Sequence, residues 1–266
     1  MQTRRTRNIF VGSLLLIGCT LLNSCTRLDP TDRKVYVAAA ANLTEVFHEL
    51  GQEFQAKTGI EVVISYASTA ELAQQIDNGA PFDVFASADA QHVDSLVAKG
   101  KLDAASRAVY AFGQLALWVP KPDDSGIVEL KDLAAKRVRF VAVAQPELAP
   151  YGRAAVETLK SAKLWETVEP KVVYGNSVNM ARQMASTGSA DAAFTAYSLV
   201  LHQPGTAVRI DSRMYGIIEQ ALAVVSSSQH LSGARQFREF VLSQEGRLQL
   251  VRGGYLVPEP GSLITK

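Results

Sequence analysis

Cysteine is nearly missing from this chain: only Cys19 and Cys25 occur among the 266 residues. Both lie within the first 25 positions, so the rest of the chain has neither a disulfide nor a thiol nucleophile. An excess of positive charge is also missing, because 27 Lys and Arg stand against 26 Asp and Glu. A dedicated nucleic-acid binder would show a basic excess. The mean hydropathy of +0.05 is far too low for a protein with many membrane spans.

The common motifs of catalysis are absent as well. The sequence contains no G-x-S-x-G, no H-E-x-x-H, no Walker A and no G-x-G-x-x-G. Asp83 and Asp89 lie near expected strand ends, and we interpret them as surface or helix-capping carboxylates. The four histidines are scattered and are expected at the surface or in packing: His48, His92, His202 and His230. We therefore expect no enzymatic activity and no cofactor.

The N-terminus has the pattern of a targeting segment. Three arginines within the first seven residues precede an apolar stretch at 10–22, which is short for a membrane span. The letters LNSC ending at Cys25 resemble a bacterial lipobox, so we expect a signal peptide at 1–25 and a lipidated Cys25. The LIGC at 16–19 and a plain secretory signal are the alternatives. Polar residues 26–33 predict a tether, and the protein is expected in the periplasm, anchored to the membrane by its lipid.

Strand-like and helix-like stretches alternate from residue 34 onward, which predicts an α/β fold. Two strand-like runs, ending near residues 40 and 66, each lead into a capping pattern. In these patterns Asn42 precedes Glu45 and Ser68 precedes Glu71 by three positions, the spacing of a capping box. The carboxyl ends of parallel strands share one sheet edge, where open α/β sheets bind ligands. We therefore expect these helix starts at a binding edge.

Two further strand-like stretches, 115–119 and 220–225, resemble crossings between two α/β units. They predict two lobes around a hinged cleft, each a mostly parallel sheet flanked by helices. The expected first lobe comprises residues 34–114 and 224–266, and the expected second lobe comprises 115–223.

Neutral hydrogen-bond donors follow several expected strands, namely Asn42, Ser68, Thr69 and Asn176. Helix N-termini present unpaired N–H groups and a partial positive charge, which suit a small anion. Each of these residues alone could be a simple cap. Several of them in one cleft would form an anion site. Arg153 is interpreted as an exposed helix residue.

Six short motifs then match one known family. The letters AAAANLT at 38–44 resemble its A-A-A-S/N-L opening, and NGAPFDVFASAD at 78–89 resembles its N-G-A-P-x-D-[VL]-F-x-S-A-D segment, the most specific match. The other four motifs lie at 66–69, 146–152, 176–178 and 253–258. The family is that of the periplasmic molybdate-binding proteins, the substrate-binding components of molybdate ABC transporters. The resemblance spans about residues 34–258 and implies the two-lobed periplasmic-binding-protein fold, type II-like.

The resemblance also implies a ligand and the residues that hold it. The ligand is molybdate, with tungstate bound similarly, and the metal is held through its oxygens only. The implied ligand residues are Ala41, Asn42, Ser68, Thr69, Tyr151 and Val178, with Ala41 and Val178 donating backbone N–H groups. Tyr151 is expected to supply a phenol in place of a tyrosine that some members carry on a later strand. The alternative is Tyr197, one residue from the matching Ala196.

The resemblance further implies a hinged clamp that closes on the anion and delivers it to an ABC permease. We expect a monomer without a nucleic-acid partner, in contact with the membrane through the lipid anchor alone. Two alternatives remain open. The protein could bind another small oxyanion or an organic anion, which Arg or Lys at the cleft would favour. An enzyme on the same scaffold would need a pair of titratable groups in the cleft.

Overall fold

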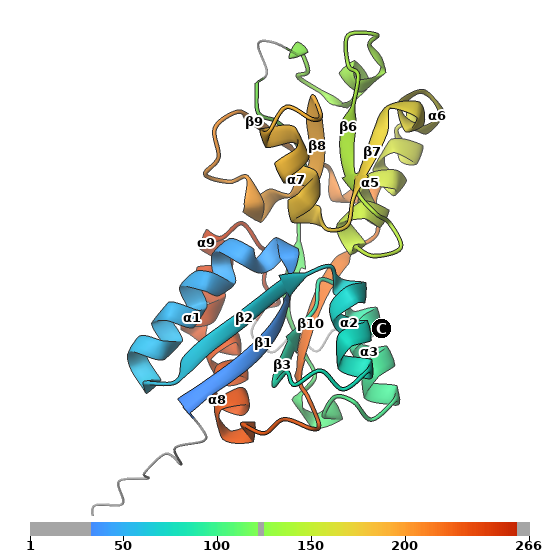
Figure 1. Ribbon diagram of the computed structural model, residues 1–266. Coiled ribbons are helices and arrows are strands. Elements are labelled where there is room, and N and C mark those ends of the chain that lie inside the picture. The colour runs from blue at the N-terminus through green and yellow to red at the C-terminus, as the bar shows by residue number, and fades with distance from the viewer. Residues whose placement is uncertain (1–32, 122–124, 260–266) are drawn as a thin grey trace, which may run out of the picture.

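The computed structural model describes residues 33–121 and 125–259. They form two five-stranded sheets flanked by helices, and Figure 1 shows the resulting two lobes one above the other. The two-lobed α/β fold expected from the sequence is thus confirmed. The expected signal peptide with Cys25, and residues 26–32 of the expected tether, lie outside the described residues. In the described part of the chain, no helix is long and apolar enough to cross a membrane.

The first lobe is built on a sheet with the order β2-β1-β3-β10-β4. Its first three strands are parallel, and β10 runs antiparallel to both of its neighbours. The strands are β1 (Lys34–Ala40), β2 (Glu61–Ala67), β3 (Val84–Ala86), β4 (Ala108–Gly113) and β10 (Ile218–Val224). The helices are α1 (Thr44–Thr58), α2 (Thr69–Asp77), α3 (Ala90–Ala98), α8 (Leu231–Leu242) and α9 (Gln244–Arg252).

Helices cover both faces of this sheet. Helices α1 and α8 pack on one face, where the ring of Phe54 meets the edge of Phe237 at 5.3 Å between centroids. Helices α2 and α3 bury Leu72 and Val93 against the other face. Because the buried residues recur at helical spacing on one side of each helix, these helices are held mainly by this packing.

The second lobe repeats the plan with the order β7-β6-β8-β5-β9. Here β6, β7 and β8 are parallel, and β5 is antiparallel to β8 and β9. The strands are β5 (Leu115–Val119), β6 (Val141–Ala144), β7 (Val172–Gly175), β8 (Ala192–Ala196) and β9 (Thr206–Arg209). The helices are α5 (Pro150–Ser161), α6 (Trp165–Val168) and α7 (Val178–Ser186).

The crossings between the lobes differ in one respect from the expectation. The first crossing runs from β4 through Gln114 into β5, as expected. The whole of β10, however, pairs with β3 and β4, so residues 218–223 belong to the first lobe and not to the second. The return crossing therefore precedes β10. An apolar run that pairs within one sheet has the same composition as one that passes between two sheets, so the sequence could not distinguish them.

Asp83 was expected as a surface or capping carboxylate, and this interpretation is wrong. The residue is only 2% exposed. Its carboxylate accepts hydrogen bonds from the backbone N–H of Tyr36 at 2.7 Å, from Ser228 Oγ at 2.7 Å and from His230 Nδ1 at 3.1 Å. The group therefore ties the start of β1 to the segment that leads into α8.

Candidate functional site

A small cavity lies between the lobes, where the carboxyl ends of parallel strands from both sheets approach each other. Its volume is about 10 Å³, roughly the space of one water molecule. Pockets for drug-sized organic ligands measure about 300–1,000 Å³. Ten uncharged residues line the cavity: Ala40, Ala41, Asn42, Ser68, Thr69, Ala88, Ala149, Pro150, Tyr151 and Val178. All six ligand residues expected from the sequence are among them.

Helices from both lobes begin at this cavity. Helix α2 starts at Thr69 in the first lobe, and helices α5 and α7 start at Pro150 and Val178 in the second. A 3₁₀ turn, η2 (Ala41–Leu43), directly follows β1. The first N–H groups of a helix have no partner within it and carry partial positive charge. The cavity is thus surrounded by backbone donors that suit an anion.

Ser68 and Thr69 add two hydroxyl groups. The capping box predicted for this segment is confirmed: Ser68 Oγ accepts from the N–H of Glu71, and Glu71 Oε2 accepts from the N–H of Ser68. Thr69 Oγ1 accepts from the backbone N–H of Ala88 at 3.3 Å. Since both hydroxyl oxygens already accept, their protons are free to be donated to a ligand.

Asn42 lies in η2, and the capping box expected from it does not form. Helix α1 begins at Thr44 with Leu43 as N-cap and without a side-chain cap. Both hydrogens of Asn42 Nδ2 point into a buried network, toward Gln220 Oε1 at 2.9 Å and the Tyr255 hydroxyl at 3.0 Å. The oxygen Oδ1 of the same side chain is buried and has no hydrogen-bond partner among the described residues.

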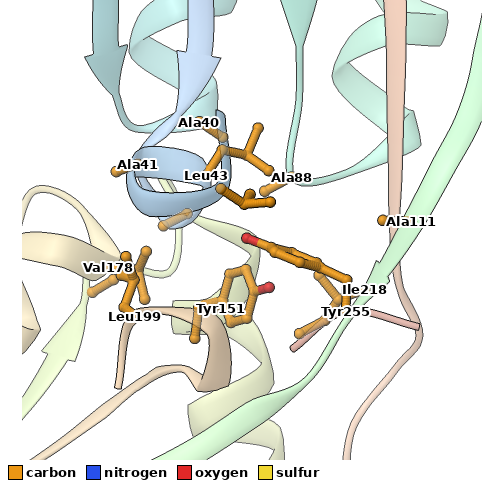
Figure 2. Packing of buried hydrophobic residues seen from close by; sticks show 14 of the residues in the cluster. Ala40, Ala41, Leu43, Ala88, Ala111, Tyr151, Val178, Leu199, Ile218 and Tyr255 are labelled. Carbon is orange, nitrogen blue, oxygen red and sulfur yellow. The ribbon is translucent and has the colours of Figure 1, made fainter. Parts of the chain in front are cut away.

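The Tyr151 hydroxyl lies behind the cavity, not in it. It accepts from Gln220 Nε2 at 3.1 Å, and a Cβ added to Gly113 would lie only 2.2 Å from it. Neither Gly113 nor Gln220 lines the cavity. Figure 2 shows this hydroxyl turned toward Ile218 and away from Val178. The structure therefore does not support the expectation that the phenol contacts the ligand. The donor left at this position is the backbone N–H of the first turn of α5.

Burial raises the pKa of the Tyr151 hydroxyl well above its ordinary value. The group therefore stays protonated and uncharged at neutral pH. A negative phenolate beside the cavity would repel an anion, and the raised pKa keeps this phenol uncharged even at alkaline pH, where an ordinary tyrosine begins to ionise.

Two other residues considered from the sequence lie away from the cavity lining. Tyr197 begins the 3₁₀ turn η6 (Tyr197–Leu199), and its ring packs 5.3 Å from the guanidinium carbon of Arg209. Asn176 was expected at the start of a helix, but the N-cap of α7 is Ser177, whose side chain accepts from the N–H of Met180. Neither Tyr197 nor Asn176 lines the cavity.

Polar contacts hold the lobes together beside the cavity. Arg153 Nη2 of α5 donates to Asp89 Oδ2 at 2.7 Å, and Asp89 also caps α3 by accepting from the N–H of His92. The backbone N–H of Ala70 donates to the carbonyl of Leu148 at 3.2 Å. The capping role expected for Asp89 is confirmed, whereas Arg153 is an interlobe residue and not simply an exposed helix residue. No sequence signal pairs two residues so far apart in the chain.

The Asp89 carboxyl is held in its ionised form. Burial opposes ionisation, but hydrogen bonds from His92 and Arg153 outweigh it and lower the pKa of Asp89 below its ordinary value. A carboxyl whose pKa is lowered in the folded protein keeps its stabilising contacts at every pH above its ordinary pKa. It loses these contacts only as the pH falls through the lowered pKa. The pair with Arg153 is therefore fully present at neutral pH.

Removal of this pair should favour opening of the lobes. Because Arg153 is partly exposed, Arg153→Ala should shift the ratio of closed to open molecules by only about two- to fivefold. The distance between spin labels on the two lobes, measured without ligand, reports this ratio. Arg213→Ala is the control, because Arg213 pairs with Asp211 in its own loop. Equal distance distributions in both variants would show that the pair does not stabilise closure.

Known proteins share this architecture. A family model described as a bacterial extracellular solute-binding protein matches residues 35–256. The molybdate-binding protein of Rhodobacter capsulatus is 36% identical over 223 residues, 82% of this chain and 86% of that protein.

Solved structures agree. The periplasmic molybdate-binding protein of Azotobacter vinelandii has a TM-score of 0.81 at 31% identity, with 85% of this chain and 100% of that chain covered. A sulfate-binding protein of Mycobacterium tuberculosis, with a TM-score of 0.72 at 19% identity over 85% of this chain and 88% of that chain, shows the fold alone. The chain therefore belongs to the bacterial extracellular solute-binding protein family, and within it to the molybdate-binding proteins.

Proposed function

We propose that this protein binds molybdate in the cavity between its lobes and delivers it to an ABC permease. The observation that carries the proposal is the convergence of helix starts from both lobes on one small cavity with an uncharged lining. The names of the relatives at 31–36% identity supply the identity of the anion.

The proposed ligand set contains only neutral donors. Backbone N–H groups come from Ala41, Tyr151 and Val178, hydroxyl groups from Ser68 and Thr69, and a side-chain amide from Asn42. Hydrogen bonds to a charged acceptor are stronger than those between neutral groups. The oxyanion is therefore held without a lysine or arginine in the lining, and its metal is reached through oxygen only. No cofactor is required.

Ligand contacts also drive closure in this proposal. Thr69 belongs to the first lobe, whereas Tyr151 and Val178 belong to the second. An anion that touches all three binds the closed state more tightly than the open state, and this difference in affinity shifts the population toward closure. The permease would then recognise the closed form.

Tungstate has the same charge and shape as molybdate, so we propose that the cavity accepts both. Sulfate shares these properties, and selection against it would rest on size. An organic anion is disfavoured because the lining formed by the described residues contains no lysine or arginine to pair with it. An enzyme is disfavoured because the described cavity lining contains no carboxylate, imidazole, thiol, lysine or arginine.

We further propose that the protein works as a monomer in the periplasm, anchored by a lipid on Cys25. The lipobox-like letters before Cys25 support the anchor. Fractionation of cells that express the whole chain tests it. The protein is expected in the membrane fraction and should move to the soluble fraction in Cys25→Ser. A soluble unmodified chain would contradict the anchor while leaving molybdate binding untouched.

Thermal unfolding in the presence of four oxyanions tests the binding function. A ligand that binds only the folded state stabilises it by about 2.7 kcal/mol at a hundredfold excess over Kd. Molybdate and tungstate should raise the unfolding temperature of the purified protein clearly, and sulfate and phosphate should leave it unchanged. A rise with sulfate or phosphate alone would identify a different oxyanion. No rise with any of the four would contradict oxyanion binding.

Thr69→Val tests the donor set, because valine keeps the shape of the side chain and removes its hydroxyl. Loss of one hydrogen bond to a charged ligand should weaken molybdate binding by about 10- to 100-fold in calorimetry. Thr58→Val is the matched control, since the Thr58 hydroxyl donates to the Phe54 carbonyl within α1. Similar affinities of the two variants would exclude the Thr69 hydroxyl from the ligand set.

A further inference from the structure

Gln220 lies on β10, and its side chain contacts Asn42 in the cavity lining. Its side chain is fully buried on β10, beside a bulge in the pairing of β10 with β4. Bulges are frequent next to functional sites, where they redirect a side chain. The Oε1 atom faces Asn42 Nδ2 at 2.9 Å and the Tyr110 hydroxyl at 3.0 Å, while Nε2 donates to the Tyr151 hydroxyl at 3.1 Å.

Donors and acceptors in this buried network are not matched one to one. The Oδ1 atom of Asn42 is buried without a partner. The Tyr151 hydroxyl accepts from Gln220 Nε2 and also interacts with the side-chain amide of Asn42. The single proton of the Tyr110 hydroxyl faces two acceptors, the Ser87 carbonyl at 2.9 Å and Gln220 Oε1 at 3.0 Å. Buried polar groups left without a partner are costly.

Rotation of both amides by 180° pairs the Asn42 Oδ1 atom and the Tyr151 and Tyr110 hydroxyls without moving other heavy atoms, and it leaves the Asn42 NH₂ group without a protein acceptor. The oxygen of Gln220 then accepts the Tyr151 proton, and its nitrogen donates to Asn42 Oδ1 and to the Tyr110 hydroxyl. The Tyr110 proton goes to the Ser87 carbonyl alone. Tyr255 loses the bond from Asn42 Nδ2 but keeps its own donation to the Asn42 carbonyl at 2.6 Å. The nitrogen of Asn42 now occupies the position of the unpartnered oxygen.

We propose that Gln220 is a positioning residue whose side-chain amide rotates together with that of Asn42 when an oxyanion enters the cavity. In the rotated arrangement Asn42 donates Nδ2–H to a ligand oxygen, and Gln220 holds it there by donating to Asn42 Oδ1. In the other arrangement Asn42 offers an acceptor, which repels an anion. This inference rests on the proposed function and adds to it a residue that touches no ligand.

Gln220→Glu tests the proposal through its response to pH. A protonated glutamic acid can donate one O–H to Asn42 Oδ1 and accept from Tyr151, as the rotated glutamine does. An ionised glutamate only accepts, so it draws Asn42 Nδ2 toward itself and leaves Oδ1 at the cavity. Burial should raise the pKa of this carboxyl, so titration from about pH 5.5 to 9.5 covers both forms.

The groups that face position 220 do not ionise in this range. Burial raises the pKa of the hydroxyls of Tyr110 on β4, Tyr151 on α5 and Tyr255 after α9 above their ordinary values. Asp89, which lies near Tyr110 at the start of α3, has a lowered pKa and stays ionised through contacts with His92 and Arg153.

The quantity to measure is the ratio of molybdate affinities of unmodified protein and variant at each pH. For Gln220→Glu we expect a ratio within about threefold of one at the acidic end and a loss of about 30-fold or more at the alkaline end. Gln220→Met, which removes donor and acceptor alike, should show a loss that does not vary with pH. A ratio for Gln220→Glu that stays constant with pH would overturn the proposal and leave Gln220 a structural role only.

Two further outcomes are distinguishable. If the unmodified protein binds no molybdate at any pH, the proposed function fails, independently of Gln220. If Gln220→Glu does not fold, side-chain amide signals in ¹⁵N–¹H spectra of the unmodified protein replace it. Molybdate should then shift the NH₂ signals of both Asn42 and Gln220. A shift of Asn42 without a shift of Gln220 would overturn the coupled rotation.

Discussion

A small anion enclosed between two lobes must find donors on every side at once, and the rest of this structure follows from that constraint. A buried charge without partners is strongly unfavourable. The cavity lining offers no opposite charge, so the compensation comes from N–H and O–H groups on both lobes. In the proposed binding mode closure and binding are one event, because neither lobe alone completes the donor set. The pair of Asp89 and Arg153 assists closure from outside the lining.

The fold delivers these donors through its topology. In both lobes parallel strands end at the interface and lead into helices or turns whose first N–H groups have no i−4 carbonyl partner within the helix. Close packing then sets their distance from the cavity. A Cβ on Gly152 would lie 2.1 Å from the Ala144 carbonyl, so the start of α5 rests directly on the end of β6. Larger residues at such positions would move the helix start away from the ligand.

Local features of this protein could be read from its sequence, whereas features that depend on distant contacts could not. The capping box of Ser68 and Glu71 and the alternation of strands and helices are set by neighbours in the chain, and both predictions are confirmed. The same reasoning was wrong for Asn42, whose amide prefers Gln220 and Tyr255, far away in the sequence. The direction of the Tyr151 hydroxyl likewise depends on strands from the other lobe. Tertiary partners outweigh local propensity where a side chain is buried between lobes.

The residues that line the cavity are uncharged and mostly small, and the polar side chains that contact them lie behind the lining. The lining contains four alanines, Ala40, Ala41, Ala88 and Ala149, whose small side chains keep the backbone close to the cavity and carry no polar atom. In the proposed binding mode, charge compensation comes largely from backbone groups that every residue possesses. Gln220 lies one layer behind the lining, where its side chain contacts Asn42 and Tyr151. In the proposed rotation the Asn42 side chain can present either a donor or an acceptor to the cavity. Its partner in this second layer then decides whether an anion is admitted.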